Sequence, residues 1–103
     1  MELKDVKKVR ASWIRKGKGF VYDSIDGSLS TGSDGVRFKL KERDGTDEVL
    51  EIVIQSRDGA YFFKTDYYDE PEKELPVKMY TSSDELLFFY RGEKGFAYFH
   101  LAE

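Results

Sequence analysis

The sequence holds few of the side chains that catalysis usually requires. His100 is the single histidine and there is no cysteine, so any histidine-assisted nucleophilic mechanism would have to use that one residue. His100 falls late in "AYFHLA", a predicted strand, across from Phe88, and this position favours a packed or rim histidine over a general base. Carboxylates are abundant, but their spacing is not specific to an acid–base pair. We therefore predict that the protein is not an enzyme.

Metal and phosphate sites are also not predicted. One histidine and no cysteine exclude the usual zinc ligand sets, and neither "DSIDGS" nor "DGTDE" has the alternating carboxylates of an EF-hand loop. Glycines cluster between residues 17 and 35, but no helix is predicted after them to complete a phosphate-binding loop. The sequence predicts no metal and no cofactor.

The segment "DYYDEPEKE", residues 66–74, is the strongest candidate for binding a protein partner. It holds five carboxylates and one lysine around a proline, and it reads as an acidic surface loop. Tyrosines offer rigid amphipathic contact area, and an acidic loop suits a basic partner surface. Alternatively, the tyrosines cap the core. The predicted partner-binding residues are Asp66, Tyr67, Tyr68, Asp69 and Glu70.

Binding of single-stranded nucleic acid is an alternative. The stretch "VRFKLK" alternates strictly, which places three basic side chains on one face of a strand. A three-residue turn in the next hairpin would put two aromatic side chains on that same face. Basic groups with aromatic rings on a curved sheet are typical of single-strand binders. The predicted residues are Arg37, Lys39, Lys41, Tyr61 and Phe63.

A small-ligand-binding β-barrel is a further alternative. The chain has eight Phe, seven Tyr and one Trp, which must supply much of a core that has no disulfides to support it. A closed sheet of this length leaves an apolar pocket only where these rings do not fill the interior.

Length and composition predict one β-rich domain spanning residues 1–103. The N-terminal "MELKDVKK" has no apolar region typical of a signal peptide, and the longest apolar cluster is "LLFFY" at residues 86–90. A soluble, cytoplasmic protein that does not enter a membrane is the expectation.

Charge is distributed unevenly along the chain. Residues 1–18 contain seven basic and two acidic side chains, whereas the remainder contains ten basic and eighteen acidic ones. A basic segment of this kind can act as a binding arm, or it can fold back against the acidic body. We favour the second interpretation.

The triplet Arg-Asp-Gly occurs twice, at residues 43–45 and 57–59, each time between apolar segments. A three-residue hairpin loop ends in a left-handed position that glycine fills without steric cost, so both triplets are predicted to be turns. The first turn sets Phe38 opposite Leu50, and Arg37 opposite Glu51, in this register or in one that differs by two residues. It also sets Lys41 opposite Asp47.

The second turn, at residues 57–59, sets Ile54 opposite Phe62. A third loop of three residues, at 93–95, predicts a C-terminal hairpin of residues 85–92 and 96–102, with Phe89 opposite Phe99 and Leu87 opposite Leu101. The stretch "LPVKMYT" predicts another strand, whose start lies near a sheet edge because proline cannot donate to a ladder.

Two further segments complete the pattern. Residues 23–35 are rich in Gly, Ser and Asp and predict a long, mobile connection. Residues 1–16 fit either an amphipathic helix or a strand, with the strand favoured by the β-rich composition around Trp13. The predicted fold is mainly β: a single antiparallel, meander-like sheet of about seven strands that curls into a small barrel or sandwich, with or without a short N-terminal helix.

Overall fold

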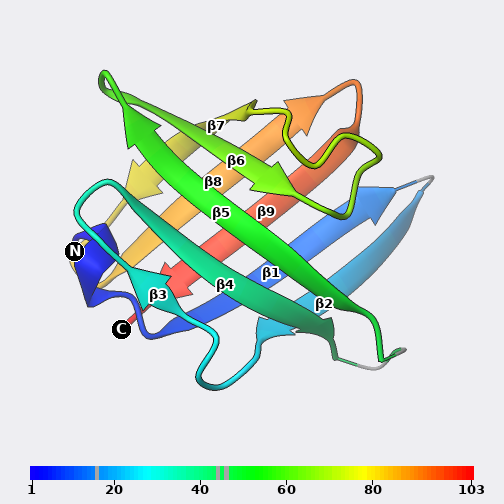
Figure 1. Ribbon diagram of the computed structural model, residues 1–103, viewed down its shortest axis with the longest axis horizontal. Coiled ribbons are helices and arrows are strands. Elements are labelled where there is room, and N and C mark those ends of the chain that lie inside the picture. The colour runs from blue at the N-terminus through cyan, green and yellow to red at the C-terminus, as the bar shows by residue number, and fades with distance from the viewer. Residues whose placement is uncertain (16, 44, 46) are drawn as a thin grey trace.

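In the computed structural model the chain forms a closed antiparallel barrel (Figure 1). The structure describes every residue except Lys16, Asp44 and Thr46, and it describes Arg15 by its backbone alone. Within these residues it contains one short 3-10 helix and nine strands: η1 (Leu3–Asp5), β1 (Lys8–Arg15), β2 (Lys18–Ser24), β3 (Ser30–Thr31), β4 (Gly35–Glu42), β5 (Val49–Arg57), β6 (Ala60–Thr65), β7 (Leu75–Thr81), β8 (Glu85–Gly92) and β9 (Gly95–Ala102).

Each strand pairs with its neighbour along the order β2-β1-β9-β8-β7-β6-β5-β4-β3, and an additional pairing of β2 with β4 closes eight strands into a ring. The short β3 stays outside that ring on the edge of β4. In Figure 1 the strands β4, β5 and β6 cross over β8, β9 and β1, which form the opposite wall. The predicted mainly β, antiparallel architecture is confirmed, and the barrel is the form it takes.

The seam between β2 and β4 is short and is reinforced by side chains. Ser24 lies opposite Leu40 there, and the Arg43 backbone N–H donates a hydrogen bond to the Val21 carbonyl at 2.9 Å. The Arg43 guanidinium donates two hydrogen bonds to the Asp23 carboxylate, at 2.9 and 2.8 Å. These contacts support a closure that has only a few ladder pairs.

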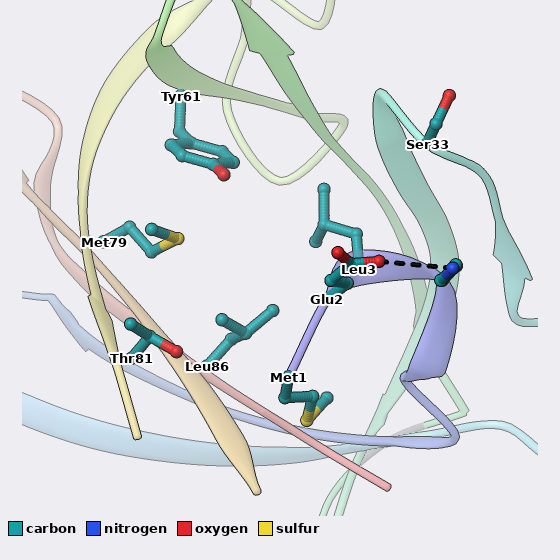
Figure 2. Close-up of a pocket in the computed structure, with 9 residues that line it drawn as sticks. Met1, Glu2, Leu3, Ser33, Tyr61, Met79, Thr81 and Leu86 are labelled. Carbon is teal, nitrogen blue, oxygen red and sulfur yellow. Dashed lines mark ion pairs between the residues drawn. The ribbon is translucent and has the colours of Figure 1, made fainter. Parts of the chain in front are cut away.

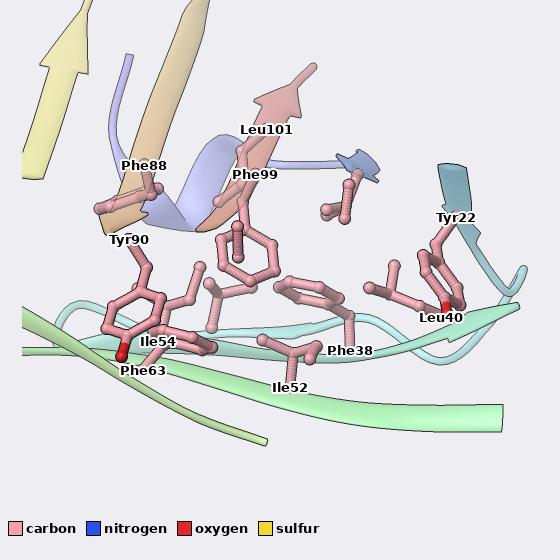
Figure 3. Close-up of a cluster of buried hydrophobic side chains, with 14 of the residues drawn as sticks. Tyr22, Phe38, Leu40, Ile52, Ile54, Phe63, Phe88, Tyr90, Phe99 and Leu101 are labelled. Atoms are coloured by element: carbon pink, nitrogen blue, oxygen red, sulfur yellow. The ribbon is translucent and has the colours of Figure 1, made fainter. Parts of the chain in front are cut away.

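Alternation along the strands fills the barrel with aromatic and aliphatic side chains (Figure 3). Inward-facing positions recur at every second residue, which is the period of a strand. Phe99 lies near the centre of this core, with its ring 5.1 Å from that of Phe63 and 6.4 Å from that of Phe38. The largest fully buried side chains are Trp13, Phe38, Phe63, Phe88, Phe99, Leu40, Ile52, Ile54 and Leu101.

The N-terminal segment is part of the barrel rather than a free arm. Val9, Ala11 and Trp13 are buried on the inner side of β1, as predicted for a strand. Before it, η1 buries Leu3, and the Lys7 N–H donates to the Ala102 carbonyl at 2.8 Å. The predicted basic segment, residues 1–18, thus contributes a central strand, although Lys16 lies outside the described residues.

The turn between β5 and β6 differs from the prediction by one residue. Asp58 and Gly59 have φ angles of 53° and 79°, which indicates a two-residue turn of type I′. Arg57 therefore lies opposite Ala60, and Ile54 lies opposite Phe63 rather than Phe62. Asp58 and Gly59 both form the turn, as predicted. Because the loop is one residue shorter, the residues of β6 that were predicted to point inward point outward, and those predicted to point outward point inward.

The hairpin of β4 and β5 has a longer connection than predicted. Phe38 lies opposite Ile52, which is the register two residues away that the pattern also allowed, and both inward sets stay on the same side. The predicted ion pairs nevertheless form: Arg37 lies 3.4 Å from Glu51, and Lys41 lies 3.5 Å from Asp47. The predicted turn residue Asp44 lies outside the described residues, as does Thr46.

The C-terminal hairpin is present, again with a turn that is one residue shorter than predicted. Gly92 lies opposite Gly95, so Phe88 pairs with Phe99 and the predicted pairing of Phe89 with Phe99 is wrong. His100 accordingly lies opposite Leu87, not Phe88. This one-residue difference decides which aromatic side chains of β8 point into the barrel.

The strand β7 lies within the ring and is not an edge strand. Pro76 pairs with Phe62 of β6, whereas pairing with β8 begins only at Lys78. The proline therefore lies beyond the end of the β7–β8 ladder, where a missing N–H leaves that ladder intact.

The segment at residues 23–35 is more structured than a free connection. It contains β3, and the Ile25 N–H donates to the Lys39 carbonyl at 2.9 Å. The Ser28 hydroxyl accepts a hydrogen bond from the Lys39 N–H at 3.1 Å. These contacts attach the segment to β4.

Candidate protein-interaction surface

One part of the barrel's outer surface is apolar. It is formed by outward side chains of β7, β8 and β9 and by the end of β1, which are neighbours in the sheet. Adjacent strands place Tyr80 opposite Leu87 and Phe89 opposite Tyr98. We call this surface the aromatic face; it comprises Ile14, Tyr80, Leu87, Phe89, Phe96 and Tyr98.

The strand β8 explains how this surface arises. Its inward residues Leu86, Phe88 and Tyr90 belong to the buried core. Its outward residues Leu87 and Phe89 are also apolar; they are half-buried, and no second layer formed by the described residues lies over them. A strand that is apolar on both sides usually lies between two packed layers, and this barrel supplies only one.

The rings of the aromatic face cluster around Phe89. The Phe89 ring centroid lies 4.8 Å from that of Tyr98, 5.4 Å from that of Tyr80 and 6.2 Å from that of Phe96. The side chains of this cluster lie outside the core: Tyr80 is 54% exposed and Ile14 is 50% exposed, whereas Phe89, Phe96 and Tyr98 are half-buried. A contiguous apolar patch of this kind is the usual mark of a contact surface.

Charged side chains border the aromatic face at both ends of its strands. Arg91 lies at one end, next to Phe96, and Lys78 lies at the β7 border, opposite Phe89. Across the part of the chain that the structure describes, neither of these two cations forms an ion pair. The face is thus apolar at its centre and carries unpaired positive charge on one side.

The other end holds the opposite charge. The Glu85 carboxylate contacts the His100 ring nitrogen Nε2. Arg10 lies beside His100 on β1, and its guanidinium is 3.9 Å from the Asp23 carboxylate.

Partial burial raises the pKa of the Tyr98 hydroxyl, and the nearby Glu85 carboxylate raises it further. Tyr98 therefore stays a neutral hydrogen-bonding group at the middle of the face.

The predicted partner-binding loop, residues 66–74, folds back onto the barrel. The Trp13 indole N–H donates to the Tyr68 hydroxyl at 3.1 Å, and the Tyr67 ring lies 4.9 Å from the Trp13 ring. Both tyrosines pack against the core and are half-buried. They close one end of the barrel, which is the alternative role that the sequence left open.

Carboxylates of the same loop make contacts within the chain. Asp66 accepts a hydrogen bond from the Glu51 backbone N–H at 2.9 Å, and Glu70 lies 3.2 Å from the Lys94 ammonium. Asp69 remains exposed at the surface. Figure 1 shows this loop beside the β8–β9 turn. The prediction of a partner site at these five residues stays a prediction, with less free charge than the sequence suggested.

The predicted nucleic-acid surface is not assembled as expected. Arg37, Lys39 and Lys41 are exposed on the outer side of β4. Phe63, however, is fully buried, and Tyr61 points inward with its ring 5.2 Å from that of Phe88. The two-residue turn at Asp58 and Gly59 is the reason. It turns Tyr61 and Phe63 inward, so they do not share the outer surface of the sheet with the three cations.

A pocket of about 400 Å³ lies at the end of the barrel near η1 (Figure 2). Tyr61, Met79 and Leu86 form its apolar wall, and Thr81 adds a hydroxyl. The Glu2 carboxylate, which lines its far side, is 3.3 Å from the Lys4 ammonium. The pocket sits above the filled core, so the hollow is at the mouth of the barrel and not along its axis.

No group of three or more His, Cys, Asp or Glu side chains converges to hold a metal ion among the residues with described positions. Over the same residues, the structure has no helix with the length and apolar character to cross a bilayer.

The comparisons with protein-family models, curated proteins and solved structures give no match for this chain. Its function therefore has to be argued from its own geometry. The aromatic face is the feature that the sequence reasoning missed. Its signal was the consecutive apolar residues of β8 at 86–90, which place apolar groups on both sides of a strand.

Proposed function

We propose that this protein is a non-catalytic interaction module that binds another protein through its aromatic face. The observation that carries the proposal is the ring cluster around Phe89, which lies outside the buried core and has no second layer over it among the residues that the structure describes. Aromatic residues and arginine are enriched in the centres of protein interfaces, whereas lysine and carboxylates are depleted there. The composition of the aromatic face, with Arg91 at its border, fits that pattern.

Covering the aromatic face would be energetically favourable. Tyr80 and Ile14 are exposed and the other rings are half-buried, and removing apolar area from water is favourable by about 25 cal/mol per Å². Hot spots of interfaces are aromatic residues at the centre of a patch with a polar border. Phe89 has that position, with Tyr98 and Tyr80 around it and Lys78 at the border.

The proposal is tested by affinity capture with a tagged protein as bait. Phe89→Ser removes the central ring, and we expect it to abolish capture of the protein that the wild type retains. Val49→Ser is the matched control, because Val49 is 44% exposed on β5, on the other wall of the barrel, and should leave capture unchanged. Equal capture by wild type and Phe89→Ser would contradict the proposal.

A second candidate function, binding of a small apolar ligand, is favoured by the pocket near η1. Its volume of about 400 Å³ is in the range of small-molecule sites. Met79→Trp should fill the pocket and abolish binding of a fluorescent apolar probe such as anilinonaphthalene sulfonate, whereas Phe89→Ser should not. If only Phe89→Ser reduces probe fluorescence, the probe binds the aromatic face and the pocket has no such role.

A further inference from the structure

The outward side chains of β8 change from acidic to apolar to basic along the strand. In order they are Glu85, Leu87, Phe89 and Arg91. At a rise of about 3.3 Å per residue, the two charged residues are about 20 Å apart, with the two apolar residues between them. When two copies of β8 are laid against each other in opposite directions, the acidic end of each strand meets the basic end of the other.

We propose that the occupant of the aromatic face is a second copy of the same chain, packed across a two-fold axis. The inference rests on the proposed function, because it names the partner for that surface. The axis lies in the contact plane, perpendicular to β8, and passes between Leu87 and Phe89. It stacks the two β8 strands in opposite directions, so that Glu85 of one copy meets Arg91 of the other.

The neighbouring strands fit the same axis. Tyr80 and Lys78 occupy the two positions on β7 that the axis exchanges, since they lie opposite Leu87 and Phe89 in the sheet. Each Lys78 ammonium thus faces the Tyr80 ring of the other copy, a favourable cation–π pair. On β9 the axis exchanges Tyr98 with His100, which brings a hydroxyl to an imidazole.

Unpaired charge on the isolated chain favours this occupant over an unrelated protein. Arg91 and Lys78 form no ion pair within the residues that the structure describes, and both lie in the half of the face that contains Phe89. The two-fold axis supplies each of them with a group from the other copy: for Arg91 the Glu85 carboxylate, which also contacts His100 of its own chain, and for Lys78 the Tyr80 ring. An unrelated partner would not require one strand to be complementary to its own reverse.

The test uses two charge reversals that are each disfavoured alone and compatible when mixed. In Arg91→Glu, two carboxylates would meet across the axis twice; in Glu85→Arg, two guanidinium groups would meet twice. A mixed dimer contains one chain of each variant. The new arginine of the Glu85→Arg chain then meets the new glutamate of the Arg91→Glu chain. The second contact of that dimer joins the unchanged Arg91 of the first chain to the unchanged Glu85 of the other, as in the wild type. Only a two-fold contact in this register predicts that pattern.

Sedimentation velocity over about 1 to 300 µM measures the dimer, a range that covers dissociation constants of weak to moderate complexes. We expect the wild type to dimerise, each single variant to have a dissociation constant raised at least about tenfold, and the equimolar mixture to recover to within about threefold of the wild type. Circular dichroism melting checks that each variant folds, and Arg91→Glu should melt like the wild type because Arg91 is exposed.

The outcomes separate this inference from the proposed function. A wild type that stays monomeric at every concentration, single variants that dimerise normally, or a mixture that does not recover would each overturn the second-copy inference. The proposed function would survive those results if wild-type bait still captured a different protein and Phe89→Ser bait did not. Loss of both capture and self-association in the wild type would overturn the two together.

Discussion

The outer surface of the barrel differs between β4–β5 and β8–β9, although the inner surfaces of these two hairpins are alike. Inside, Phe38 faces Ile52 and Phe88 faces Phe99, and all four side chains are fully buried. Outside, β4 presents charged residues, among them Arg37, which pairs with Glu51 of β5, whereas β8 and β9 present a cluster of half-buried rings.

The difference shows which residues the fold itself requires. Burial of the inward set closes the barrel on both walls, so folding does not depend on apolar residues outside. Charged outward residues keep a barrel wall hydrated, as on β4. The apolar outward residues of β8 and β9 therefore need a different explanation, and a contact surface is the one that fits their clustering.

The largest expected effect comes from changing a side chain that points into the barrel. Phe88→Ala removes a fully buried ring, and we expect it to lower the free energy of unfolding by about 3 to 5 kcal/mol. Urea denaturation with and without the substitution measures the change. A loss below about 1 kcal/mol would mean that Phe88 does not face the core.

The adjacent residue gives the matched outer substitution. Phe89→Ala should cost at most about 1.5 kcal/mol, because it loses cross-strand ring contacts but opens no cavity. The same denaturation experiment compares the two neighbours directly. A reversed order, with Phe89→Ala the more damaging, would show that the alternation along β8 is inverted and that Phe89 belongs to the core.

The seam between β2 and β4 should be sensitive to acid. The Arg43 hydrogen bonds hold the pKa of Asp23 below its ordinary value of 3.8, so the folded chain keeps this carboxylate ionised where the unfolded chain binds a proton. The stabilisation is full above the ordinary pKa and is lost as pH falls through the lowered one. Asp23 is about half exposed, so the contribution should be at most about 1 kcal/mol.

Asp23→Asn removes that titration and tests the attribution. We expect the thermal midpoint of the variant to fall less steeply than that of the wild type between about pH 5 and pH 2, the interval in which the carboxyl titrates. Parallel pH profiles for the two proteins would show that another group governs the acid sensitivity of the barrel.

The smallest effect concerns the charged outer surface. A double-mutant cycle with Arg37→Ala and Glu51→Ala should give a coupling energy below about 1 kcal/mol, because both side chains are largely in solvent. Added salt should reduce it further. A coupling of several kcal/mol would mean that the wall of β4 and β5 contributes to folding through its outer residues.

Much of this architecture could be predicted from alternation. Phe38 and Leu40 point inward as expected, since the basic residues on the other side of β4 leave the pattern one solution, and the register sets Ile52 inward opposite Phe38. A shift of two residues in the β4–β5 register changed no face. The strand type, the antiparallel pairing and the C-terminal hairpin followed from the same signal.

The candidate site could not be predicted in this way, because the strands that form it are apolar on both sides. In β8 and β9 alternation does not choose between Phe88 and Phe89 as the buried residue, so the turn length decides. The two-residue turn at Glu93 and Lys94, rather than three residues, inverts the assignment. The same error in the turn at Asp58 and Gly59 placed Tyr61 on the wrong face.

Photo-crosslinking in cells that express the protein tests most directly whether the aromatic face is a contact surface. A benzophenone-bearing phenylalanine replaces Phe89 in one variant and Lys39, which is exposed on the opposite wall, in another. We expect irradiation to give a covalent adduct with another protein or a second copy from position 89, and none from position 39. No adduct at position 89, or equal yields at both positions, would contradict the assignment of this surface.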